Sequence, residues 1–181
     1  GGKTLVVVGV GHIGGAAGRH CQQLGMRVIG VSRHGSPVDG IDQIVTTASL
    51  DDVLPEADFI LMAVPLTTET RNLLDCRRQA LMRNDAGVIN LGRSGTMDYD
   101  ALAANLSSGR FRGAVLDVFD PEPLPRESVL WRTPNLLVTP HISADDGDSY
   151  VEMTLDLIFK NLDRTLRNEP LQNIVNPKLG Y

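Results

Sequence analysis

The chain has 181 residues, 42% of them hydrophobic and 22% charged, with a formal net charge of −5 and a pI near 5.3. A globular chain of this length buries about 70% of its extended surface, enough for one full core. The acidic balance argues against a nucleic-acid partner, because neutralising phosphates requires clustered Lys and Arg.

Apolar strands and amphipathic helices are expected to alternate along the chain. The expected strands lie at residues 4–9, 26–31, 58–64, 86–91, 111–118 and 135–140, and the expected helices at 13–25, 49–57, 75–82, 98–109 and 147–167. Ser49 is expected to cap the second helix. Strands that are apolar on both faces and separated by helices predict a doubly wound α/β fold with a parallel sheet covered on each side.

Neither a metal site nor a membrane span is indicated. The two cysteines, Cys21 and Cys76, lie far apart and outside any CxxC spacing, so we expect no metal ligands and no disulfide framework. No apolar run approaches the length of a membrane span, and the N-terminal residues lack the pattern of a signal peptide. We therefore expect a cytoplasmic protein with no membrane partner.

The motif GVGHIG, residues 9–14, follows the first expected strand and opens the first expected helix. In that setting Gly9 permits a tight turn, Gly11 lets the backbone approach a pyrophosphate, and Gly14 allows close packing of helix on strand. The phosphates would lie at the amides of His12 and Ile13, where the helix dipole favours negative charge. This predicts a Rossmann-type dinucleotide-binding domain. The alternatives are a turn that only packs the helix and a methyltransferase nucleotide site.

Ser32, Arg33 and His34 follow the second expected strand, where many dinucleotide-binding proteins place an acidic residue for a ribose hydroxyl. Arg33 can present a planar cationic fork to a phosphate, with hydrogen-bond donors from Ser32 and His34 beside it. The pattern favours NADP, with NAD possible. In the alternative reading Arg33 is a solvated turn residue, or stacks beneath an adenine, and both cofactors are accepted.

Arg93, Asp117, Glu122 and His141 follow the last three expected strands. The carboxyl ends of parallel strands form one rim, and ligands bind in the crevice outside it. An arginine can hold a carboxylate, a histidine can exchange a proton with a carbonyl oxygen, and a glutamate can orient that histidine. Separately, Arg93 could pair with a surface carboxylate, Glu122 could lie in a solvated turn, and His141 could be structural.

The segments VVVGVGHIG, ADFILMAVPLTTETRNLL, LMRNDAGVINLGRSGTMD, GAVLDVFDPEPLP and NLLVTPHIS resemble the D-isomer-specific 2-hydroxyacid dehydrogenase family in order and spacing, over nearly the whole chain. The resemblance implies that Arg93 binds the substrate carboxylate, His141 is the acid/base, and Glu122 is paired with that histidine. It also implies that Asp117 lies near the nicotinamide.

The same resemblance places further residues at the cofactor and shows two departures. Val64 and Pro65 match a segment that lines the cofactor cleft, and Leu91 ends the strand before the arginine loop. Ser94 stands where the family usually has Gly or Pro after the arginine, and HISADDGD replaces the commoner turn after the histidine. These departures put the local backbone and the substrate-side contacts in doubt.

NADP preference resembles the family's glyoxylate and hydroxypyruvate reductases, which reduce small 2-ketoacids. We expect residues 1–146 to be the dinucleotide-binding domain, and residues 147–181 to be a long helix and tail that return toward a substrate domain otherwise absent from these residues. Because a water-excluding cleft needs both domains, residues 1–181 alone are expected to bind a dinucleotide but to turn over slowly or not at all.

Two further expectations concern partners and class. In the family, the cofactor domains of two chains pair, so we expect a homodimer, with Pro121–Pro134 as a candidate contact. In the alternative, Trp131 of that segment is buried and packs inside its own chain. The alternative from another functional class is a dinucleotide-sensing regulatory module of the same fold.

Overall fold

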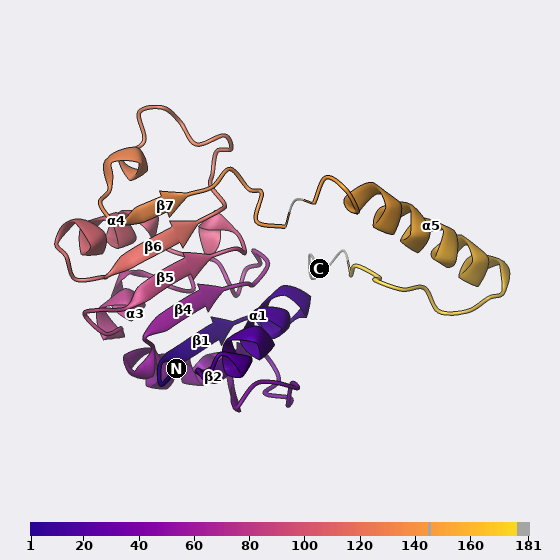
Figure 1. The fold of residues 1–181 in the computed structure, drawn as a ribbon, viewed down its shortest axis with the longest axis horizontal. Helices are drawn as coiled ribbons and strands as arrows, with labels where there is room; N and C mark the ends of the chain where they lie inside the picture. The colour runs from indigo at the N-terminus through magenta and orange to yellow at the C-terminus, as the bar shows by residue number, and fades with distance from the viewer. Residues whose placement is uncertain (145, 177–181) are drawn as a thin grey trace. The chain divides into compact units, whose positions relative to one another are not determined.

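The computed structural model describes residues 1–144 and 146–176. The chain divides into two compact units, Gly1–Pro140 and His141–Tyr181. The first unit contains the sheet and the second contains the long helix α5 (Figure 1).

The described strands of the first unit form one seven-stranded parallel sheet in the order β3-β2-β1-β4-β5-β6-β7. The strands are β1 (Thr4–Val8), β2 (Arg27–Ser32), β3 (Gln43–Thr46), β4 (Phe59–Met62), β5 (Gly87–Asn90), β6 (Gly113–Leu116) and β7 (Leu136–Val138). The α-helices are α1 (His12–Gln23), α2 (Leu50–Val53), α3 (Cys76–Leu81), α4 (Tyr99–Ser107) and α5 (Tyr150–Leu166). Short 3-10 turns lie at η1 (Thr47–Ser49), η2 (Leu54–Glu56), η3 (Ser94–Thr96) and η4 (Val129–Arg132). The strand order reverses between β1 and β4, which is the switch point where ligands bind in such sheets.

Hydrophobic side chains cover both faces of the sheet. On one face α1 packs Ala17 and Cys21 against Val7 and Val28. On the other face α2 and α4 contribute fully buried leucines, including Leu102 of α4. Figure 1 shows α1 on one side of the sheet and α3 and α4 on the other. The doubly wound α/β class predicted from alternating apolar strands and helices is confirmed.

Local structure differs from the predicted elements around residues 43–57. β3 is absent from the predicted strands, because only four residues pair there at the sheet edge and half of them are polar. The helix predicted at 49–57 is an α-helix only over Leu50–Val53, flanked by η1 and η2. Pro55 in η2 has no N–H for a helical hydrogen bond. The predicted cap is wrong: the Ser49 side chain makes no capping bond, since Ser49 ends η1 with φ −94° and ψ 12° rather than in an extended conformation.

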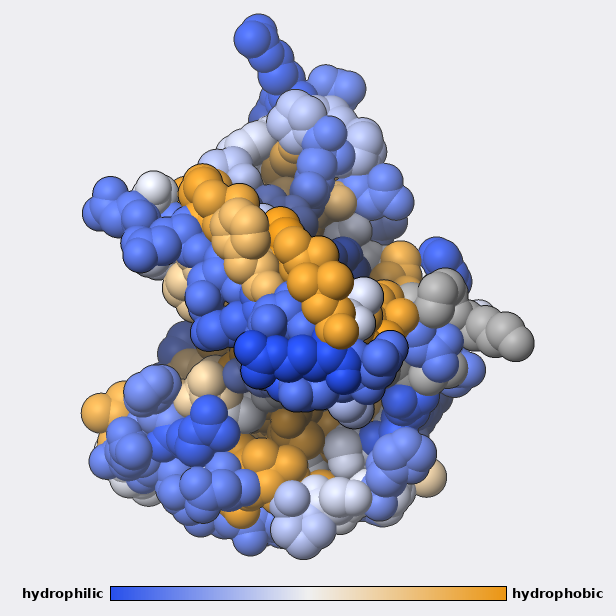
Figure 2. Space-filling view, turned by 90° about the vertical axis from the view of Figure 1, so that its right-hand side faces the viewer, coloured by the Kyte–Doolittle hydropathy of each residue, from blue (hydrophilic) through white to orange (hydrophobic). Residues whose placement is uncertain are grey.

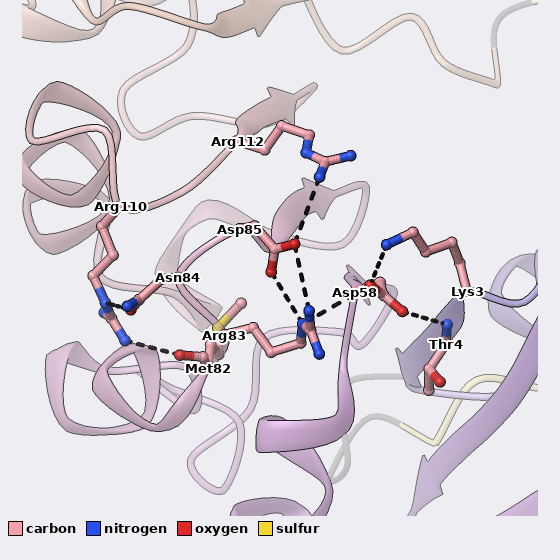
Figure 3. Close-up of polar contacts among 9 residues, drawn as sticks. All are labelled: Lys3, Thr4, Asp58, Met82, Arg83, Asn84, Asp85, Arg110 and Arg112. Atoms are coloured by element: carbon pink, nitrogen blue, oxygen red, sulfur yellow. Dashed lines mark hydrogen bonds and ion pairs between the residues drawn. The ribbon is translucent and has the colours of Figure 1, made fainter.

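Charged residues at the amino ends of the strands pair in a row (Figure 3). Asp58, just before β4, accepts from Lys3 Nζ at 2.7 Å and lies 3.8 Å from Arg83 Nε. Asp85, before β5, lies 3.0 Å from Arg83 and 3.5 Å from Arg112. The cations of these pairs are at least 44% exposed, and surface ion pairs contribute about 0–1 kcal/mol each. They stabilise the edge of the sheet opposite to the glycine turn.

The second unit is dominated by α5, which is confirmed as a long amphipathic helix. Its large apolar side chains are exposed, from Val151 (65%) to Leu166 (76%). Figure 2 shows a face of the protein on which hydrophobic patches are flanked by hydrophilic ones. Over the residues that the structure describes, no helix has the length and apolarity needed to cross a membrane.

Candidate active site

The glycine turn after β1 requires glycine at two of its positions. Gly9 has φ +96°, and a Cβ there would lie 2.7 Å from Ala63 O. A Cβ at Gly14 would lie 1.9 Å from Gly9 O, so α1 approaches the turn too closely for any side chain. The Gly9 N–H donates to Val31 O at 2.9 Å, which ties the turn to β2. The backbone between β1 and α1 is therefore held in a narrow bend.

Gly11 differs from its two neighbours in the motif, because a Cβ on it would meet nothing within 4 Å. It is the N-cap of α1, has no side chain to cap the helix, and is followed by a first turn without acidic residues. The first N–H groups of an α-helix have no partner within the helix, so those of His12 and Ile13 can bind an anion. The Ile13 side chain is 55% exposed. This open, positively polarised helix end fits the pyrophosphate of a dinucleotide.

The end of β2 forms a tight turn beside the glycine motif. Ser32 Oγ accepts from Gly35 N at 3.0 Å, and Arg33 and His34 are exposed on that turn. The hydrogen bond from Thr67 is the largest cause that lowers the pKa of Glu69, and the positive charge of Arg33 lowers it further. A cationic group is thus present where the second strand ends.

The switch point lies where the loops after β1 and β4 meet. Val64 and Pro65 follow β4, and a Cβ on Gly9 would lie 2.7 Å from Val64 Cγ1. Thr70 Oγ1 donates to Pro65 O at 2.6 Å and fixes the loop. Leu91, after β5, donates its N–H to Met62 O at 3.0 Å. Val64, Pro65 and Leu91 are half-buried. Val64 and Pro65 lie in the loop beside the glycine turn, and Leu91 follows β5, one strand further along the sheet.

The loop that carries Arg93 is held by Asn90, the last residue of β5. Asn90 is fully buried; its Oδ1 accepts from Gly92 N at 3.0 Å and its Nδ2 donates to Arg93 O at 3.2 Å. Thr96 Oγ1 also donates to Arg93 O, at 2.6 Å. The Arg93 side chain is exposed, with Nη1 donating to Gly92 O at 2.7 Å. The backbone is fixed while the guanidinium faces outward.

The loop after β6 carries Asp117 and Glu122. Asp117 is 1% exposed and accepts from Thr139 Oγ1 at 2.6 Å. Glu122 is exposed, and its Oε1 accepts from Phe119 N at 2.7 Å. Tyr99 Oη donates to Val118 O at 2.8 Å, between these two acidic residues. Burial raises the pKa of Tyr99 above its ordinary value, which already leaves the phenol protonated at neutral pH.

His141 is the first residue of the second unit. It is exposed and has a left-handed backbone conformation, with φ +59°. The first unit therefore brings together the glycine turn, the turn at Ser32, and the loops of Arg93, Asp117 and Glu122 on the carboxyl edge of one sheet.

Asn90, Tyr99 and Thr139 are polar residues of this rim that the sequence analysis did not single out. Asn90 could have been noticed as a polar residue ending the apolar strand in AGVINL, because a buried polar side chain needs hydrogen-bond partners. Tyr99 and Thr139 had no such signal, since each is distant in sequence from the group that it binds.

The parallel sheet with a glycine turn at its switch point defines a Rossmann-type dinucleotide-binding fold. Residues 1–143 match the family model described as "D-isomer specific 2-hydroxyacid dehydrogenase, NAD binding domain". The chain belongs to this family, as its sequence motifs predicted.

Known relatives agree with this assignment. The chain is 35% identical to a glyoxylate reductase of Pyrococcus horikoshii over 175 residues, which are 97% of this chain and 52% of the relative. It spans about half the length of the curated relatives it matches.

Solved structures are similar over almost all of the chain. A D-isomer specific 2-hydroxyacid dehydrogenase from Xanthobacter autotrophicus Py2, in complex with NADPH and MES, has a TM-score of 0.90 at 34% identity, covering 99% of this chain and 73% of that one. An NADPH-dependent glyoxylate/hydroxypyruvate reductase from Sinorhizobium meliloti, in complex with NADP and sulfate, has a TM-score of 0.91 at 33% identity, covering 99% and 57%.

Proposed function

We propose that the chain is the cofactor-binding part of a D-2-hydroxyacid dehydrogenase that transfers a hydride between NADP(H) and a small 2-ketoacid or 2-hydroxyacid. The observation that carries the proposal is the open backbone at Gly11, on a helix end at the switch point of a parallel sheet. We call this open helix end at Gly11 the glycine cradle. It is shaped or flanked by Gly9, Gly14, Val64, Pro65 and Leu91.

Three side chains are proposed for the chemistry. Arg93 holds the substrate carboxylate with its exposed guanidinium, since an arginine fork matches a carboxylate. His141 gives a proton to the carbonyl oxygen during reduction and takes it back during oxidation, and Glu122 orients the histidine. When bound, the nicotinamide supplies or accepts the hydride, and Asp117 is proposed to lie beside it.

The proposed preference for NADP rests on the turn after β2. Ser32 and the exposed Arg33 and His34 offer donors and positive charge to a 2'-phosphate, whereas a carboxylate at Ser32 would repel it. The relatives solved with NADPH or NADP support this choice.

We further propose a cytoplasmic homodimer in which the Pro121–Pro134 segment contributes to the contact. Trp131 is 52% exposed in the single chain, and its Nε1 donates to Pro125 O at 2.7 Å. An exposed indole held in one orientation suits an interface better than the buried packing role considered above.

The test measures the rates at which the protein, as its host makes it, reduces glyoxylate, hydroxypyruvate and bulkier 2-ketoacids with NADPH and with NADH. Arg33→Ala is expected to weaken NADPH binding more than NADH binding. Arg112→Ala, which removes a cation at the opposite edge of the sheet, is the matched control and should change neither. Equal use of both cofactors would contradict the role of Arg33. Dinucleotide binding without turnover of any 2-ketoacid would favour a sensing module.

A further inference from the structure

The loops that carry Arg93 and Glu122 are joined by a buried hydrogen-bonded chain. Asn90 Nδ2 donates to Tyr99 Oη at 3.1 Å as well as to Arg93 O at 3.2 Å. Tyr99 Oη donates in turn to Val118 O at 2.8 Å. A phenol has one proton, so the direction is determined: it accepts from Asn90 and donates to Val118.

The chain continues to the side chain of Glu122. Val118 is 1% exposed, and the next residue, Phe119, donates its N–H to Glu122 Oε1 at 2.7 Å. The Asp117 N–H donates to Asn90 O at 3.2 Å, so Asn90 contacts both loops directly. Each step from Arg93 O to Glu122 Oε1 is therefore a bond of 3.2 Å or less, or a covalent link.

Packing holds the phenol in place. The Tyr99 ring meets the Phe119 ring edge to face, with centroids 6.3 Å apart and planes at 69°. All the hydrogen-bonding groups of the buried Asn90 amide are engaged in the described contacts, with Gly92, Arg93 and Tyr99. Fully satisfied buried networks are rigid, because breaking one bond leaves a buried polar group unpaired.

We propose that Tyr99, together with Asn90, is a positioning residue that fixes the loop of Arg93, which binds the substrate in the proposed function, relative to the loop of Glu122, which orients the acid/base. The inference rests on the proposed function of those two residues. A displacement of about 1 Å between reacting groups can reduce turnover by up to about 100-fold, which is why such a tether matters.

The test compares Tyr99→Phe with the unmodified protein. This variant removes the hydroxyl and keeps the ring against Phe119. Tyr150→Phe, at an exposed tyrosine of α5, is the matched control. We expect Tyr99→Phe to lower kcat/KM for the 2-ketoacid by about 10-fold to 100-fold, to raise its KM, and to shift the pH profile of kcat/KM. The Kd for the dinucleotide should stay within about twofold, because the phenol is not part of the glycine cradle.

A purely structural role would lower the amount of active protein, leaving the KM and the pH profile unchanged. Unchanged kcat/KM, or a loss in kcat alone with the same KM and pH profile, would therefore overturn the proposal. If the protein as its host makes it reduces no 2-ketoacid, the proposed function fails, and amide hydrogen exchange then decides whether Tyr99 tethers the two loops. Faster exchange in Tyr99→Phe confined to residues 92–96 and 117–122 supports it, and unchanged exchange there overturns it.

Discussion

A methyl group at Gly14 tests whether the glycine turn is held by close packing. In Gly14→Ala the new Cβ would lie 1.9 Å from Gly9 O, 3.0 Å from Val7 Cγ1 and 3.1 Å from Gly9 C. Two of these three atoms belong to the backbone, so no side-chain rotation relieves the contact. Either α1 moves away from β1 or the turn opens.

The magnitude follows from two opposing terms. Overpacking of a close-packed site costs about 1–3 kcal/mol, occasionally more. Alanine gains about 0.5–1 kcal/mol over glycine within a helix. Gly15, the next residue of α1, is the matched control, because its Cβ would meet Val10 O at 3.4 Å, an ordinary contact. We therefore expect Gly14→Ala to be destabilised and Gly15→Ala to be neutral or more stable by up to about 1 kcal/mol.

Thermal unfolding of both variants measures the difference. For a chain of this size 1 kcal/mol corresponds to about 2–4 °C in Tm, so Gly14→Ala should unfold several degrees below Gly15→Ala. NADPH titration should show weaker binding by Gly14→Ala as well, since the displaced turn is the proposed phosphate site. Equal Tm values for the two variants and the unmodified protein would refute the packing reasoning.

Three further outcomes are expected. Hydrogen bonds from Arg77 and Arg78 lower the pKa of Asp51 from 3.8 to about 2. The Asp51 carboxylate therefore stabilises the fold at neutral pH and loses that effect as pH falls from about 4 to about 2. Urea unfolding of Asp51→Asn should show a lower free energy of unfolding at pH 7 and a flatter dependence of that free energy on pH. Superimposable stability profiles of Asp51→Asn and the unmodified protein would contradict this. Gly11→Ala places its Cβ where no atom lies within 4 Å, so its Tm should be close to that of the unmodified protein. Its affinity for the dinucleotide, measured by fluorescence titration, should fall at least about tenfold, and an unchanged affinity would count against the glycine cradle. Ser32→Asp should shift the ratio of kcat/KM values from NADPH toward NADH, and an unchanged ratio would contradict the proposed phosphate site.

Local signals in the sequence were enough for most of the first unit. Runs of apolar residues predicted six strands of the sheet, and Asp75 and Asp98, whose carboxylates cap α3 and α4, lie where those helices were expected to begin. β3 was missed because a four-residue edge strand is held by its neighbour: Asp42, just before it, accepts from Val28 N at 2.7 Å. Such a contact joins residues 14 positions apart and leaves no periodic pattern.

In the candidate site, too, local sequence signals identified some residues, whereas contacts between distant residues could be seen only in the structure. Gly9, Gly11 and Gly14 could be assigned from one motif, because their roles are set by backbone conformation close along the chain. The partners of Asp117 and Val118, Thr139 and Tyr99, lie 22 and 19 residues away and could not be assigned from the sequence.

By itself the sequence determined the fold class, because hydrophobic periodicity and glycine spacing are local properties that a parallel α/β sheet must satisfy. It indicated the family through the resemblance of its motifs, in their order and spacing. Only the tertiary structure decided that Asn90 and Tyr99 join the Arg93 loop to the Glu122 loop, and that Gly11 alone of the three motif glycines faces open space. The physical reason is that hydrogen bonds and steric contacts act over a few ångströms in space, and which residues come that close is set by how the strands are ordered in the sheet.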